Sequence, residues 1–472
     1  MDRSAAAPLR AVQKTALSYD RGHLLVRGTF RPPGSDWDPA LRAYRVPAFA
    51  YSRVVAALRC EEADFDDAVW EDVPGSISPV SLPLRDYQSK ALESWARAGR
   101  RGIVVLPTGS GKTFVGLQAV ADLRVPVLVC VPTLDLVEQW RDEIRKVLGV
   151  EAGAFTGERK DIRAVTVATY DSAAINAETL GNRFPFLLFD EVHHLAAPAY
   201  GRIAEMAAAP CRLGLTATLE REDGAHARLE KLVGPKVMEV PIANLAGTHL
   251  AEYDVRVVTT QLTPGEEAEY RRNHLIFRSF VRAANIKFRG PRDFQRLIMR
   301  SGRDPRARTA LLARHRARTI ALNSASKMAA LREVLQAHPG ERTLIFTEFN
   351  DLVYRISREF LVPAVTHKTP KEERARNLEG FRAGTYSALV TSRVLDEGID
   401  VPEASVGVIL SGTGSTRAYR QRLGRILRKR EGKRALLYEI VSKKTSEVGT
   451  MRRRHTPVSV KLARGRGRRA AA

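Results

Sequence analysis

Residues spaced as in a phosphate-binding loop occur at positions 106–113, where the chain reads Leu-Pro-Thr-Gly-Ser-Gly-Lys-Thr. Glycines in such a loop let backbone N–H groups approach phosphate oxygens that a Cβ would block. Lys112 could hold the β- and γ-phosphates, and the Thr113 hydroxyl could ligate Mg²⁺. Leu106 stands where the strict motif has glycine, so a chance glycine turn is the alternative. The predicted nucleotide-binding residues are Thr108, Gly109, Ser110, Gly111, Lys112 and Thr113.

Two adjacent acids, Asp190 and Glu191, directly follow the apolar run at 186–189. Open α/β sheets bind their ligands at the carboxyl ends of the strands, so this is a suitable position for catalytic carboxylates. Asp190 could hold Mg²⁺, and Glu191 could deprotonate an attacking water. A solvated acidic turn is the alternative. Farther along, Thr216 and Thr218 follow another apolar run and could link the phosphate state to domain movement.

The C-terminal part of the chain has no phosphate-binding loop, but it contains Gln-Arg-Leu-Gly-Arg-Ile-Leu-Arg at 421–428. Arg425 and Arg428 lie three residues apart and would share one helix face. Arginines that reach a γ-phosphate across a cleft contribute about 10³–10⁵ in rate. The alternative is a solvated basic helix. We therefore expect catalytic roles for Gln421, Arg425 and Arg428, with Glu397, Gly398 and Asp400 lining the same cleft.

Short apolar strands alternate with amphipathic segments twice along the chain, which predicts two parallel α/β sheets. The first sheet should lie within residues 81–255 and the second within 326–450. A further strand at 255–262 should leave the first sheet. Strands are expected at 102–105, 125–131, 165–168, 186–189, 343–346, 388–390, 406–410 and 436–441, and an amphipathic helix over 134–147.

Positive charge is concentrated between residues 271 and 318, which hold fifteen Lys or Arg against two acids, in a chain of net charge +23. Such a span can displace counterions from a phosphate backbone. We expect two or three helices here, broken near 290–291 and 302–305, with DNA contacts from Arg271, Arg278, Arg282 and Lys287. Phenylalanines at 277, 280, 288 and 294 lie between these charges and could stack on bases, or those at 277, 280 and 288 could form the packed face of a helical hairpin.

Composition excludes several other classes of protein. At 472 residues the chain should fold as several domains. It has no apolar run of about twenty residues that could cross a membrane, and residues 1–16 do not resemble a secretory signal. The three cysteines are far apart, which argues against zinc, iron–sulfur and disulfide frameworks and favours the cytoplasm.

The ordered motifs Gly-Ser-Gly-Lys-Thr, Asp-Glu-Val-His, Thr-Ala-Thr, Asp-Glu-Gly-Ile-Asp and Gln-Arg-Leu-Gly-Arg resemble those of superfamily 2 helicases. This resemblance covers residues 81–445. It implies two RecA-like domains with ATP between them and nucleic acid across their top. Arg85-Asp86-Tyr87-Gln88 is similar to the glutamine element of that superfamily, so Arg85 and Gln88 would contact the nucleotide and Gln88 would read the adenine edge. A helix-start glutamine is the alternative.

Within that superfamily the chain is similar to the XPB family of DNA translocases. Arg221-Glu222-Asp223 resembles its RED motif, which implies a role in strand separation, and the basic span lies where the family's thumb occurs. The resemblance implies ATP- and Mg²⁺-dependent movement on DNA, 3′ to 5′, in nucleotide excision repair. Junctions and forks would be the DNA substrates and a repair nuclease a partner. No membrane partner is expected, and no oligomer is required.

The expected domains are an N-terminal damage-recognition-like module (1–80), a first RecA-like domain (81–255), a linker strand with the thumb (256–325), a second RecA-like domain (326–450) and a basic, disordered tail (451–472). Two other functions stay open. One is an RNA helicase or the motor subunit of a restriction system. The other is a nucleic-acid clamp that binds ATP as a switch, without processive unwinding.

Overall fold

The computed structural model describes residues 14–219, 224–245, 248–249, 251–288, 291–392, 404–411, 419 and 434–454. These residues form two compact units. The first is built from 1–105, 113–216 and 225–239, and the second from 106–112, 217–224 and 240–472, as far as these ranges are described. In the described part of the chain, no helix is both long enough and apolar enough to cross a membrane.

The first unit begins with a small module made of one mixed sheet and one helix. Its strand order is β3-β4-β2-β1-β5, in which β1 and β5 are parallel and the other neighbours antiparallel. Leu17, Leu24 and Val54 are buried in its core. The elements are β1 (Thr15–Asp20), β2 (His23–Arg27), β3 (Asp36–Asp38), β4 (Ala43–Pro47), α1 (Tyr51–Cys60) and β5 (Phe65–Ala68).

This N-terminal module is bonded to the rest of the first unit. The Tyr19 hydroxyl donates to the carbonyl oxygens of Glu178 and Met206, at 2.9 and 3.0 Å. The ring of Phe49 lies 4.6 Å from the guanidinium carbon of Arg212, whose side chain is completely buried. Burial lowers the pKa of Arg212 well below its ordinary value. Its N–H groups are nevertheless satisfied, because they donate to three backbone carbonyls.

The larger part of the first unit is a seven-stranded parallel sheet of order β12-β6-β11-β10-β7-β9-β8. Its central strands are buried on both faces, which explains their continuous apolar sequences. The four strands expected in this region are all present. The strands are β6 (Arg101–Val105), β7 (Val127–Val131), β8 (Gly153–Phe155), β9 (Val165–Thr169), β10 (Phe186–Asp190), β11 (Cys211–Thr216) and β12 (Lys236–Glu239).

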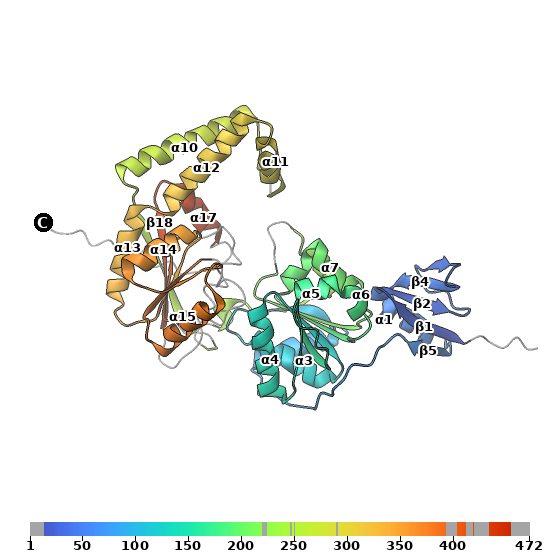
Figure 1. Cartoon of the computed structure of the whole chain (residues 1–472). Helices are drawn as coiled ribbons and strands as arrows, with labels where there is room; N and C mark the ends of the chain where they lie inside the picture. The colour runs from blue at the N-terminus through green and yellow to red at the C-terminus, as the bar shows by residue number, and fades with distance from the viewer. Residues whose placement is uncertain are drawn as a thin grey trace, which may run out of the picture. The chain divides into compact units, whose positions relative to one another are not determined.

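Helices cover both faces of this sheet. In Figure 1, α3 and α4 lie together on one side of the sheet and α5 and α7 on the other. Right-handed connections that run in opposite directions along a parallel sheet place their helices on opposite faces. A side chain at Gly116 in α3 would collide with Leu188 and Trp140, so this glycine allows α3 to pack closely. The helices are α2 (Asp86–Arg97), α3 (Lys112–Leu123), α4 (Leu134–Leu148), α5 (Tyr170–Ile175), α6 (Ala177–Leu180), α7 (Pro198–Glu205) and α8 (Ala227–Leu232).

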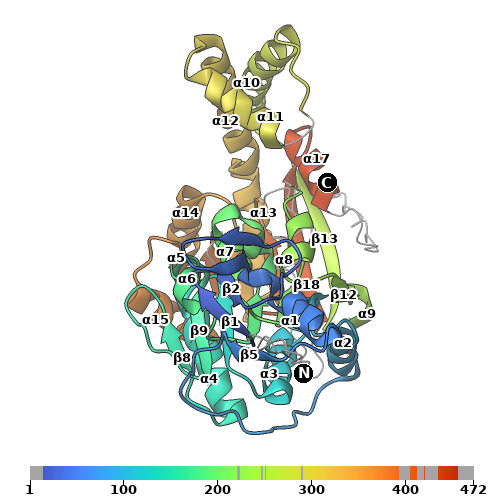
Figure 2. The same ribbon diagram turned by 90° about the vertical axis from the view of Figure 1, so that its right-hand side faces the viewer.

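The second unit contains a six-stranded parallel sheet of order β13-β18-β17-β14-β16-β15. The strand expected at 255–262 does leave the first sheet, because β13 pairs along its whole length with β18, and Figure 2 shows the two strands side by side. The strands are β13 (Glu252–Thr260), β14 (Thr343–Phe346), β15 (Ala364–Val365), β16 (Ala388–Thr391), β17 (Val406–Ile409) and β18 (Arg434–Ser442).

The basic span forms the expected helical insertion, here called the thumb (residues 264–322). Its helices α10 and α12 run side by side, with α11 at the far end of the pair (Figures 1 and 2). Buried alanines at 307, 310, 313, 317 and 321 line one side of α12, so the two long helices can approach closely. The helices of this unit are α9 (Ile242–Leu245), α10 (Pro264–Ala283), α11 (Pro291–Ser301), α12 (Pro305–Leu322), α13 (Ala325–Ala337), α14 (Asn350–Phe360), α15 (Lys371–Ala383) and α17 (Ser446–Arg454).

Candidate functional site

The expected phosphate-binding loop follows β6 directly and leads into α3. Gly109 and Gly111 have φ angles of 82° and 79°, which lie in the left-handed region that favours glycine. Ser110 is buried, and its hydroxyl donates to the carbonyl of Pro107 at 2.6 Å, which closes the turn. The loop is therefore a built turn rather than a chance pair of glycines. Thr113 lies in the first turn of α3, next to Lys112.

Two polar groups of this loop are suited to an anionic ligand. The Lys112 ammonium is half-buried, and it makes a long contact, 3.4 Å, with the carbonyl oxygen of Leu106. The Thr108 hydroxyl oxygen is buried and has no hydrogen-bond partner among the described residues. A buried hydroxyl without a partner costs free energy, which a phosphate oxygen at this position would recover. The composition of the loop thus fits a nucleotide phosphate.

Asp190 is the last residue of β10, and its carboxylate is held from two sides. The indole N–H of Trp140 donates to Oδ2 at 2.9 Å, and the backbone N–H of Glu191 donates to Oδ1 at 3.0 Å. The Tyr170 hydroxyl donates to the Asp190 carbonyl at 2.9 Å. Burial raises the pKa of Tyr170 well above its ordinary value, so this hydroxyl stays protonated as a donor. Asp190 is only 8% exposed, which excludes the solvated acidic turn.

Glu191 adopts a left-handed backbone conformation, with φ of 47° and ψ of 54°. A non-glycine residue there stores strain, which is typical of functional sites. The Thr216 hydroxyl donates to Glu191 Oε2 at 3.2 Å, and His193 Nδ1 lies 3.2 Å from the Thr216 oxygen. His193 Nδ1 also lies 3.5 Å from Glu191 Oε2, so the histidine, the hydroxyl and the carboxylate form one cluster. These contacts orient the Glu191 carboxylate, whose side chain is only 14% exposed.

Strand register explains why these residues meet. Leu215 of β11 pairs with Asp190 of β10, and Thr216 pairs with Val105, the last residue of β6. The acidic pair, the hydroxyl of Thr216 and the last residue of β6 therefore lie at one edge of a parallel sheet. Thr218 is buried two residues beyond Thr216.

Gln88 lies in the first turn of α2 and is buried there. Its side-chain oxygen accepts the backbone N–H of Arg85 at 2.8 Å, and the Arg85 guanidinium donates to the Tyr87 hydroxyl at 3.1 Å. This is the contact expected of a helix-start glutamine. The cap orients the amide nitrogen, and the contact with adenine stays a prediction.

Several expected site residues lie outside the described part of the chain. They include Arg221, Glu222 and Asp223 of the expected RED motif and Glu397, Gly398 and Asp400 of the expected cleft. Gln421, Arg425 and Arg428 also lie outside it. Their roles remain predictions from the sequence.

The thumb carries the expected basic side chains on its surface. Arg271, Arg278, Arg282 and Lys287 are all exposed. Arg271 is paired with Glu267 at 2.6 Å. The phenylalanine rings make contacts within the thumb, although Phe288 stays 43% exposed. The rings at 277 and 288 stack at 6.3 Å, and a guanidinium, that of residue 314, lies 4.3 Å from the ring at 294. The packed-face interpretation stays a prediction.

Trp140 and Tyr170, which position Asp190, are functional residues that sequence reasoning missed. By its spacing, Trp140 belongs simply to the apolar face of the helix at 134–147. A buried tryptophan or tyrosine usually finds a partner for its polar group, and this rule marks such residues for attention. It does not name the partner, because the partners lie 50 and 20 residues away in the chain.

Three family models match the chain in consecutive segments. Residues 17–69 match the xeroderma pigmentosum group B helicase damage recognition domain, residues 81–221 the type III restriction enzyme res subunit, and residues 326–430 the helicase conserved C-terminal domain. The chain is 42% identical to the DNA 3′-5′ translocase XPB2 of Sulfurisphaera tokodaii, over 93% of this chain and 99% of that protein. This chain belongs to the XPB family. Both the resemblance and the expected enzyme class, an ATP-dependent DNA helicase, are thereby confirmed.

Other matches extend this assignment. The DNA 3′-5′ helicase XPB of Mycobacterium tuberculosis is 33% identical over 79% of this XPB-family chain, which spans only 64% of the length of that relative. The helicase domain of Pyrococcus furiosus Hef has a solved structure that covers 78% of this chain and 97% of its own, with a TM-score of 0.52 and 19% identity. That likeness confirms the expected fold, a RecA-like helicase with parallel sheets.

Proposed function

We propose that this protein uses ATP hydrolysis to move on duplex DNA or open it, 3′ to 5′, during nucleotide excision repair. The observation that carries the proposal is the orientation of Glu191 by Thr216 and His193, directly after a buried Asp190. Family membership and the damage recognition model at 17–69 support DNA, rather than RNA, as the polymer.

The residues of the site divide the work of phosphoryl transfer. Lys112 and the loop N–H groups would bind the phosphates, and Thr108 would donate its unpaired hydroxyl. Thr113 and Asp190 would hold Mg²⁺, which when bound neutralises charge on the phosphate oxygens. Glu191 would take a proton from the attacking water, while the hydroxyl at 216 keeps its carboxylate aimed. The histidine at 193 would link the state of this carboxylate to β11 through the same hydroxyl.

Polymer preference separates this proposal from its alternatives. We expect ATP turnover to be stimulated most by duplex or forked DNA, less by RNA, and least without a polymer. In Lys112→Ala, turnover should fall about 10²–10³-fold, as expected when one preorganised charge donor is removed, while DNA affinity is retained. Lys90 is exposed on α2 and offers the control Lys90→Ala. Turnover that does not respond to any polymer would favour the clamp, and a preference for RNA would favour an RNA helicase.

The thumb should contribute phosphate contacts that depend on salt. Replacing Arg278, Arg282 and Lys287 by alanine should weaken duplex binding. It should also lower the log–log salt slope by about 0.9 for each phosphate that the variant no longer neutralises. A control with an equal change of charge replaces three exposed residues of α15, outside the thumb: Lys371, Arg376 and Arg382. The measurement is the duplex affinity of each variant between low and moderate salt. The same salt slope in the thumb variant as in the unmodified protein would exclude phosphate binding by the thumb.

Polarity and partner are further parts of the proposal. Strand displacement on forks with a 3′ or a 5′ single-stranded arm tests the direction, and 5′-arm preference would reject it. We infer a repair nuclease as the protein partner from the family's association with damage recognition. Pull-down of this protein with a candidate nuclease on forked DNA would test that inference.

A further inference from the structure

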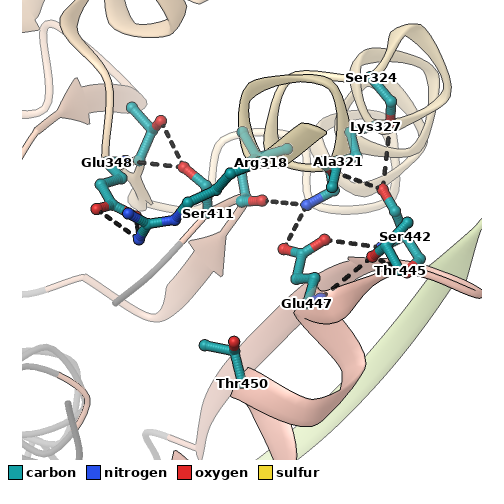
Figure 3. A network of polar contacts seen from close by, with 12 residues as sticks. Arg318, Ala321, Ser324, Lys327, Glu348, Ser411, Ser442, Thr445, Glu447 and Thr450 are labelled. Atoms are coloured by element: carbon teal, nitrogen blue, oxygen red, sulfur yellow. Dashed lines mark hydrogen bonds and ion pairs between the residues drawn. The ribbon is translucent and has the colours of Figure 1, made fainter. Parts of the chain in front are cut away.

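The thumb is fastened to the second sheet by a buried network at the root of α12. Arg318, in the last turn but one of that helix, donates to both carboxylate oxygens of Glu348 at 2.8 and 2.7 Å (Figure 3). The Glu348 side chain is 3% exposed. Both hydrogen bonds start from one guanidinium nitrogen, Nη2, and such charge-assisted bonds to a buried carboxylate are stronger than neutral ones.

Glu348 in turn lies at the carboxyl end of β14, where the next strand of the sheet also ends. Its backbone N–H donates to the Ser411 hydroxyl oxygen at 2.8 Å, and the Thr347 and Ser411 hydroxyls are 2.8 Å apart. β14 and β17 are parallel neighbours, and the backbone N–H of Leu410 continues their ladder by donating to Phe346. Arg318 is therefore connected, through Glu348, to the ends of both β14 and β17.

A second set of contacts near the end of α12 also reaches the carboxyl end of β17. Lys327, in the first turn of α13, donates to the carbonyl of Leu410 and pairs with Glu447, both at 2.6 Å. Glu447 also accepts the backbone N–H of Ser442, whose hydroxyl donates to the carbonyl of Ala321 in α12. Figure 3 shows these contacts joining α12, α13, β18 and α17. Leu410 is therefore bonded to Lys327, and Ser411 is bonded to Glu348.

The burial of this network explains why it transmits displacement. Lys327 and Glu447 are 1% and 3% exposed, so a shift that separates them breaks a buried ion pair, which is costly. A shift of Arg318 removes one charged partner from the Glu348 carboxylate, whose side chain is 3% exposed. A displaced α12 must therefore carry the ends of β14 and β17 with it.

We propose that Arg318 and Glu348 form a coupling link that passes a DNA-induced displacement of the thumb to the carboxyl ends of β14 and β17, and so sets the stimulation of ATP turnover by DNA. This inference rests on the proposed function. Carboxyl strand ends are where parallel sheets engage their ligands. In the sequence, Ser411 precedes the first residue of the expected arginine motif, Gln421, by ten positions. Glu348 is a positioning residue in this scheme and contacts neither DNA nor nucleotide.

The test compares Glu348→Gln with Glu359→Gln. Glutamine keeps the shape of Glu348 but removes the charge that holds the Arg318 guanidinium. Glu359 is the matched control, because it pairs with Arg332 on the surface of the same unit, at 2.8 Å, away from the strand ends. Four quantities are measured for each full-length variant: turnover without DNA, turnover at saturating duplex, the dissociation constant for duplex with its salt slope, and the midpoint of thermal unfolding.

We expect Glu348→Gln to keep turnover without DNA and duplex affinity within about twofold. Its stimulation by saturating duplex should fall by a factor within the usual range for coupling between sites, about 5- to 150-fold. Glu359→Gln should behave as the unmodified protein does. Arg318→Lys keeps the charge but replaces the planar guanidinium by an ammonium, so it should reduce stimulation partially. This variant provides the test if Glu348→Gln unfolds.

Three results would overturn the link. Full stimulation of ATP turnover by duplex in a folded Glu348→Gln or Arg318→Lys would show that the ion pair has only a structural role. Weaker duplex affinity with normal stimulation at saturation would place the pair in DNA binding. Equal decreases with and without DNA would indicate damage to the ATP site. If the unmodified protein itself were not stimulated by DNA, the proposed function would fail first and the link with it.

Discussion

Glu191→Gln is expected to lower ATP turnover by about 10²–10⁴-fold, the usual contribution of a general base. Glutamine has the same shape and can still accept from the Thr216 hydroxyl, so the 3.2 Å hydrogen bond to Thr216 should survive. The variant lacks the negative charge that accepts a proton from water. ATP binding should persist, because the phosphate-binding loop is untouched. Single-turnover hydrolysis and equilibrium binding of a fluorescent ATP analogue would separate the two effects.

Glu158→Gln provides a matched control, because Glu158 is an exposed glutamate of the same unit. It should leave both quantities unchanged. Glu191→Gln with turnover within about threefold of the unmodified protein would remove Glu191 from the role of base. Asp190, whose carboxylate is held by Trp140, would then be the next candidate.

Arg425→Ala should reduce turnover by about 10³–10⁵ if its guanidinium stabilises charge on the transferred phosphoryl group. The reduction should appear in the catalytic constant rather than in ATP affinity, since this charge develops in the transition state. Arg430→Ala is the control, because residue 430 falls on a different face from 425 and 428 at helical spacing. Steady-state kinetics at saturating DNA measures the effect. An equal catalytic constant in the two variants would reject this role for Arg425.

Much of the fold is readable from local sequence. Strands β6, β7, β9 and β10 are continuous apolar runs, because parallel strands are covered on both faces. The breaks between the thumb helices are marked by proline and glycine near 290–291 and 302–305, as found at the starts of α11 and α12. Such signals need only neighbouring residues, so a single chain reveals them.

Pairings between residues distant in sequence are not readable in this way. The departure of the strand at 252–260 from the first sheet is expected, but its partner, β18, lies 182 residues onward. Lys327 and Glu447 are 120 residues apart, and each alone resembles an ordinary surface charge. Arg212 is, by sequence, an ordinary residue of a strand, yet its guanidinium is completely buried under Phe49. Burial of a charge depends on which elements meet, and composition does not encode that locally.

The sequence alone determined the chemistry available to this protein: a glycine-rich turn before a lysine, an acid pair at a strand end, and a basic helical span. Those features depend on residue type and short spacing. Only the tertiary structure decided how the groups are held. It placed Thr216 beside Glu191 through the register of β10 and β11, gave Asp190 its bond to Trp140, and joined the root of α12 to the end of β14. The physical reason is that orientation and burial come from packing between elements far apart in the chain, where desolvation makes each paired contact obligatory.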